Sequence, residues 1–149
     1  MNKEEMLLSI ERAKHAHLEQ MYKIDALTKG KKVKNPTPIG KMNCECGGWF
    51  YANEKLMKDI LGLQLFERLD MYHEQWHTEY LHIYDIFFKN RNKGLFSKLI
   101  GSDKISEMDL DKAKLYYVEL KETTDELLKV SNAAERRVAA VGDAKFLIS

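Results

Sequence analysis

Residues 63–90 read LQLFERLDMYHEQWHTEYLHIYDIFFKN, and this stretch carries the clearest structural signal in the chain. Its apolar and aromatic residues recur every three or four positions, which is the spacing of one face of an α-helix. Neither Gly nor Pro interrupts the run. We therefore expect a helix over about 63–90 that buries one face, made of Phe66, Leu69, His73, Trp76, His77, Tyr80, Tyr84 and Phe87.

A second helix is predicted upstream, over about 3–29. Lys29-Gly30 is a suitable end, because a cation in the last turn followed by Gly favours helix termination. The spacing of its apolar stripe is again helical. The stripe comprises Met6, Ile10, Ala13, His17, Ile24 and Leu27.

The region 30–50 contains both Pro residues and both Cys residues, and we expect a long loop there. A short helix over 54–61 should follow, with Asn53 as its N-cap and Gly62 as its end. The stretch 91–104, with two Gly and many Lys, is predicted as a loop or a short amphipathic helix.

The last predicted helix begins near Ser106, where Ser106 and Asp109 resemble a capping box. It continues past Val130 towards Val141, and Ala113, Tyr116, Tyr117, Leu120, Leu127 and Leu128 form its apolar face. No strand-like alternation persists. The fold class is therefore all-α, a four-helix-bundle-like domain with a long loop that carries a Cys. The chain is expected to be one domain, 1–149, with a C-terminal helical extension over 131–149.

The composition narrows the classes of function. The 24 basic and 23 acidic residues give a net charge of +1, which argues against a nucleic-acid-binding module. No run of about 18 apolar residues suggests a membrane span. The N-terminus lacks a signal-peptide pattern, and two Cys one residue apart make no disulfide framework, so we expect a cytoplasmic protein.

Four side chains are candidate metal ligands: His17, Cys44, His73 and His77. His73 and His77 are four residues apart, so they lie one turn apart on one helix face. His17 lies on the buried stripe of the first helix, and Cys44 or Cys46 supplies a thiolate next to Gly. One Cys with three His suits Zn²⁺. Alternatively, these are core histidines bonded to backbone or Tyr hydroxyl groups, beside ordinary free thiols.

The same residues resemble the bacterial chemoreceptor zinc-binding domain, called CZB. That family has a His on its first helix, Cys-x-x-Gly-x-Trp after a loop, and His-x-x-x-His on a later helix. Here the motifs are His17, CECGGW at 44–49 and HEQWH at 73–77. The resemblance covers about residues 8–130. Gln20 stands where the family often has Trp, and Cys46 where it usually has a large apolar residue.

The resemblance implies a zinc site of three His and Cys44 in a homodimeric four-helix bundle. It also implies a sensory, non-enzymatic module that responds to zinc or to oxidants such as hypochlorous acid. Such domains accompany chemotaxis receptors or diguanylate cyclases, so chemotaxis or cyclic-di-GMP signalling proteins are the expected partners. We expect a stand-alone version, because 149 residues leave no room for a fused signalling domain.

Two enzymatic alternatives share these residues. HEQWH also fits the H-E-x-x-H motif of zinc metallopeptidases, with Glu74 as general base. The longer motif fails, because Tyr80 occupies the Gly position and residue 83 is not His. A carboxylate-bridged di-iron centre would use Glu74 with His77 and Glu79 with His82, yet both pairs lie on one predicted helix. A purely structural zinc protein is the third alternative.

Overall fold

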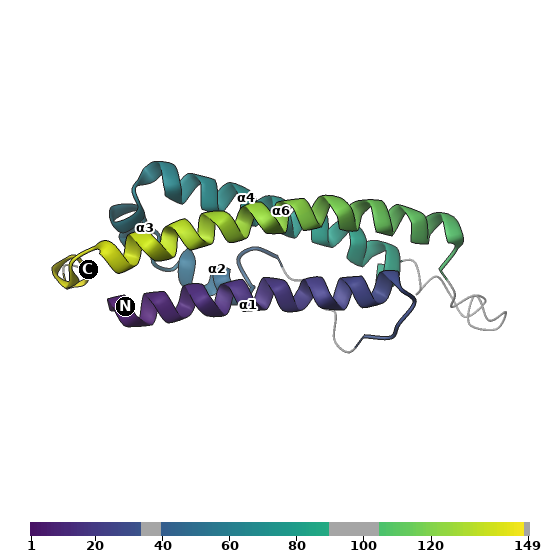
Figure 1. Ribbon diagram of the computed structural model, residues 1–149, viewed down its shortest axis with the longest axis horizontal. Helices are drawn as coiled ribbons and strands as arrows, with labels where there is room; N and C mark the ends of the chain where they lie inside the picture. Colours follow the sequence, from purple (N-terminus) through teal and green to yellow (C-terminus); the bar gives the residue numbers. More distant parts are fainter. Residues whose placement is uncertain (34–39, 90–104, 148–149) are drawn as a thin grey trace.

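Three long helices lie side by side in the computed structural model, which describes residues 1–33, 40–89 and 105–147 (Figure 1). They are α1 (Lys3–Thr28), α4 (Leu63–Tyr84) and α6 (Glu107–Ala140). Helix α6 packs against both others and runs antiparallel to them. The start of α1 therefore lies beside the end of α6, where Lys3 Nζ donates a hydrogen bond to the Val141 carbonyl. The predicted all-α, bundle-like fold is confirmed.

Helix α1 has a reciprocal N-terminal cap. The Asn2 side chain accepts a hydrogen bond from the Glu5 amide, and the Glu5 carboxylate accepts one from the Asn2 amide. These two bonds satisfy donors that the first helical turn leaves without partners. At the other end, Gly30 adopts φ +77°, which an L side chain rarely tolerates. The predicted helix over 3–29 is therefore confirmed to within one residue.

The region predicted as one loop over 30–50 contains a short helix, α2 (Glu45–Phe50), so that part of the prediction is wrong. Its two Gly residues have low helix propensity, so propensity alone does not predict α2. Cys44 is the N-cap, and its sulfur accepts a hydrogen bond from the Gly47 amide at 3.1 Å. Cys44, the predicted ligand, therefore lies at the start of a helix and not within an irregular loop.

Helix α3 (Glu54–Leu61) has the predicted bounds and ends at Gly62, which adopts φ +81°. Asn53 occupies the N-cap position, but its side chain makes no capping bond. It donates instead to the Trp49 carbonyl at 2.7 Å, which joins α3 to the end of α2. The predicted capping bond is not formed, because the Asn53 backbone, at φ −112° and ψ 26°, lacks the extended conformation of an N-cap.

Helix α4 continues as a π-helical segment, η1 (Asp85–Lys89), which completes most of the helix predicted over 63–90. The prediction for 91–104 lies outside the described residues. Helix α6 begins as predicted, since the Ser106 hydroxyl accepts a hydrogen bond from the Asp109 amide at 3.1 Å. It extends to Ala140, and a short 3-10 helix, η2 (Asp143–Phe146), follows within the predicted extension.

The core lies where the three long helices meet, and α3 covers one end of it. Trp76 is 1% exposed, and its indole N–H donates to the Thr124 hydroxyl at 2.9 Å. This bond joins the centres of α4 and α6 without leaving a buried donor unpaired. Among the described helices, none combines the length and apolar character needed to cross a bilayer.

A candidate metal centre

The four predicted ligands come together in the structure. His17 comes from α1, Cys44 from the N-cap of α2, and His73 and His77 from successive turns of α4. One donor atom from each lies within 4.8 Å of every other. The three imidazoles are buried and the thiol is partly buried. The arrangement can therefore hold a metal ion.

The spacing of the donor atoms fits a small tetrahedral site. His73 Nε2 lies 3.2 Å from Cys44 Sγ and 3.1 Å from His77 Nε2. Adjacent N and S ligands of a tetrahedral Zn²⁺ lie roughly 3.3–3.7 Å apart at ordinary bond lengths. Small adjustments of the side chains would therefore bring these three atoms to the separations that an ion requires.

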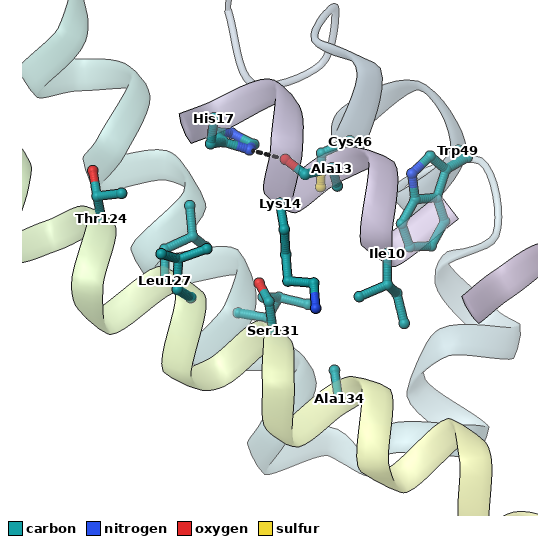
Figure 2. A pocket seen from close by; sticks show the side chains of 12 residues that line it. Ile10, Ala13, Lys14, His17, Cys46, Trp49, Thr124, Leu127, Ser131 and Ala134 are labelled. Atoms are coloured by element: carbon teal, nitrogen blue, oxygen red, sulfur yellow. Dashed lines mark hydrogen bonds between the residues drawn. The ribbon is translucent and has the colours of Figure 1, made fainter. Parts of the chain in front are cut away.

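His17 has a feature that core packing does not explain. Its Nδ1 donates a hydrogen bond to the Ala13 carbonyl at 2.8 Å, which Figure 2 shows as a dashed line. Its Nε2 is then a bare acceptor, and this atom is buried with no hydrogen-bond partner in the described structure. A buried polar atom without a partner is costly and calls for an explanation. Metal coordination would satisfy it.

His73 is oriented by a chain of hydrogen bonds on its outer side. The Tyr51 hydroxyl donates to Asp70 Oδ1 at 2.6 Å and therefore accepts from His73 Nδ1, 3.2 Å away. This pattern assigns the proton to Nδ1, so the Nε2 lone pair faces the other donors. Burial and the hydrogen bond to Asp70 raise the pKa of Tyr51, which keeps its hydroxyl a proton donor.

Cys44 is held by a turn that only glycine permits. A Cβ added to Gly47 would lie 1.7 Å from the Lys41 carbonyl oxygen, so no side chain fits there. The close approach lets the Gly47 amide donate to Cys44 Sγ. Residues 41–47 therefore form a tight loop around the sulfur, which explains the Cys-x-x-Gly spacing in physical terms.

The surroundings favour the thiolate form of Cys44. A hydrogen bond with Cys46 lowers the pKa of Cys44 most, and burial opposes this effect. The same hydrogen bond, together with burial, raises the pKa of Cys46 well above its ordinary value. Burial holds the pKa of His73 below its usual range, so the ring is kept neutral. A thiolate with neutral imidazole is the protonation state that metal ligands need.

A cleft and a smaller apolar cavity border the cluster. A cleft of about 180 Å³, lined by His17, Cys44 and His77 together with Gln20, leads to the donor atoms. Behind His17, between α1 and α6, lies a small apolar cavity of about 20 Å³ (Figure 2). Cys46 lines this second cavity. An ion or a small reagent would therefore reach the cluster from the side of Cys44.

Two other histidines and the second cysteine are not part of the donor group. His15 and His82 are exposed and lie outside the cluster. Cys46 is buried and is not one of the four grouped residues. The roles of Tyr51 and Asp70 were not predicted, because their contacts with His73 arise only when α2 docks on α4.

Comparison of the chain with protein-family models, with curated proteins and with solved structures gives no match. The four donor atoms and their surroundings are therefore the basis for inferring the function.

Proposed function

We propose that this chain is a zinc-binding sensory module of the kind that CZB domains represent. His17, Cys44, His73 and His77 hold the ion, and the module responds to zinc or to oxidants by acting on a partner protein. The observation that supports this most is the grouping of four donor atoms within 4.8 Å from three separate helices. The unpartnered Nε2 of His17 adds independent support.

The donor set favours zinc over other common ions. Three imidazoles and one thiolate match the N and S ligands of tetrahedral Zn²⁺, whereas Mg²⁺ and Ca²⁺ require oxygen. The bound ion would supply positive charge that stabilises the thiolate and ties the three helices together. Because the ligands must lose protons, binding would release protons and contribute to folding stability.

Cys44 is the ligand through which an oxidant would act. Its sulfur borders the open cleft, so a peroxide can approach it. The thiolate would give two electrons to the peroxide as the O–O bond breaks and an S–O bond forms. One oxygen of the peroxide joins the sulfur, the other leaves as an alkoxide or hydroxide, and Cys44 becomes a sulfenic acid. The oxidised sulfur is a poorer ligand, so α2 would loosen from α1 and α4, which is a two-state element for signalling.

A catalytic role is less well supported. Four protein ligands would fill a tetrahedral shell and leave no position for an activated water. The Glu74 side chain, the general base of the peptidase alternative, is 62% exposed and lies 3.6 Å from Lys41 Nζ. The resemblance to CZB domains leads us to propose a cytoplasmic, non-enzymatic homodimer whose partners are chemotaxis or cyclic-di-GMP signalling proteins.

The direct experiment measures how much zinc the purified full chain binds and whether peroxide releases it. We expect one zinc per chain, loss of tight binding in His77→Ala, and retention in His82→Ala, a control histidine exposed on the same helix. Peroxide should then release zinc to a colorimetric chelator. Absence of stoichiometric zinc would contradict the metal site. Bound zinc that peroxide does not release would indicate a purely structural role.

A further inference from the structure

We propose that Tyr51 and Asp70 position His73 for the ion, and that they do so before any metal binds. This inference rests on the proposed metal site, because it concerns how one ligand of that site is oriented. Tyr51 and Asp70 are positioning residues, and neither belongs to the group of four donors.

The contacts form a continuous chain from the ring to a carboxylate. His73 Nδ1 donates to the Tyr51 hydroxyl at 3.2 Å, and that hydroxyl donates to Asp70 Oδ1 at 2.6 Å. The Tyr51 ring also lies 26° from parallel to the His73 ring, with centroids 6.0 Å apart. Together the two contacts limit rotation of the imidazole and select the tautomer whose Nε2 has a free lone pair.

Lys41 fixes the far end of this chain. Its Nζ lies 3.3 Å from Asp70 Oδ1 and 5.3 Å from the centroid of the Tyr51 ring. Asp70 therefore has a cation and a hydroxyl donor on the same oxygen. Such charge-assisted bonds are stronger than neutral ones, so the carboxylate is well held.

The sequence positions explain why this arrangement serves the whole site. Lys41 and Tyr51 flank Cys44 in the segment 40–51, whereas Asp70 and His73 are three residues apart on α4. The contacts that orient His73 therefore also dock the segment that carries the sulfur onto the helix that carries two imidazoles. Partners of this kind typically change metal affinity by about 10–100-fold when they are removed.

Packing alone is the competing explanation for Tyr51, since its ring also contacts Phe50 at a centroid distance of 5.0 Å. Tyr51→Phe separates the two, because it keeps the ring and removes only the hydroxyl. Asp70→Asn is a second, milder change that removes the charge and leaves an oxygen acceptor. Tyr72→Phe is the matched control, because Tyr72 is also half-buried but belongs to neither the hydrogen-bond chain nor the donor group.

Two measurements on the full chain test the proposal. Nitrogen-15 NMR of the histidine rings reports the tautomer of His73 in metal-free protein, and competition titration reports zinc affinity. We expect the wild type and Tyr72→Phe to show the Nδ1–H tautomer. Tyr51→Phe should lose this preference and bind zinc about 10–100-fold more weakly. Asp70→Asn should change both measurements in the same direction by a smaller amount.

Contrary outcomes are distinguishable. If Tyr51→Phe keeps the tautomer and binds zinc as the wild type does, the positioning role is wrong while the metal site stands. If circular dichroism shows that Tyr51→Phe does not fold, Asp70→Asn decides, and unchanged affinity and tautomer in that variant overturn the proposal. If the wild type itself binds no zinc, the proposed function fails instead.

Discussion

His73 Nε2 lies 3.2 Å from Cys44 Sγ, although 29 positions separate the two residues in the sequence. The contact joins the start of α2 to the middle of α4. On its opposite side, the His73 ring is bonded to Tyr51, which lies at the end of α2. Both ends of the short helix α2 therefore meet one imidazole.

Removal of metal should lower the thermal stability of the chain. Zinc binds only the folded arrangement of the four ligands, so free zinc at about 1,000 times its dissociation constant stabilises the fold by roughly 4 kcal/mol. For a chain of this size that corresponds to a rise in Tm of roughly 10 °C. Calorimetry with zinc and with excess chelator measures the difference. Coincident melting curves would mean that zinc does not support the fold.

Substitution of the two cysteines should give different results. Cys44→Ala should retain the helices, weaken zinc binding strongly and abolish zinc release by peroxide, because the sulfur ligand is gone. Cys46→Ala removes a hydrogen-bond partner of the sulfur but no ligand, so it should weaken zinc binding much less than Cys44→Ala does. Zinc titration and a release assay on both variants provide the measurement. Loss of binding in Cys46→Ala alone would reverse the assignment of the ligand.

Gly47 and Gly48 form a matched pair for testing the turn around the sulfur. A Cβ at Gly47 would overlap the Lys41 carbonyl, whereas a Cβ at Gly48 meets nothing within 4 Å. Gly47→Ala should therefore displace residues 41–44, cost about 1–3 kcal/mol in stability and weaken zinc binding. Gly48→Ala should change neither property measurably. Chemical denaturation and zinc titration test both variants, and equal behaviour would contradict the account of the turn.

Glu74→Gln tests the peptidase alternative. The Glu74 carboxylate lies beside Lys41 and outside the donor group, so we expect the variant to bind zinc as the wild type does. We also expect neither protein to cleave a mixture of denatured proteins. Mass spectrometry of the digestion products makes the comparison. Cleavage by the wild type that Glu74→Gln abolishes would establish a metallopeptidase.

The positions of the helices were predictable from the sequence where the helical spacing of apolar residues persists over a long stretch. The apolar stripes of α1 and α4 repeat over many turns, and burial matches most of their members. Helix α2 was missed because its sequence, ECGGWF, has two Gly and no repeat that a pattern search can use. It is held by tertiary contacts, which include its packing against α1 and the hydrogen bond from Tyr51 at its end to Asp70 on α4, and local propensity does not report these.

The ligands of the candidate site were predictable from the sequence, but the side chains that surround and orient them were not. His73 and His77 were recognisable because a spacing of four places both rings on one face. His17 was recognisable from its place on the buried stripe, whereas the choice of Cys44 over Cys46 came from the resemblance to CZB domains. The bond from Tyr51 to Asp70 was not, because a Tyr and an Asp 19 residues apart give no local signal of contact. Neither was the role of Lys41, which depends on how the segment before α2 docks on α4.

X-ray absorption at the zinc edge, on the purified full chain loaded with one equivalent of zinc, tests the central claim most directly. The proposed site requires three nitrogen ligands at about 2.0–2.1 Å and a single sulfur at about 2.3 Å, with imidazole scattering. A shell with no sulfur, a shell with two sulfurs, or a mainly oxygen shell from a loosely bound ion would contradict it.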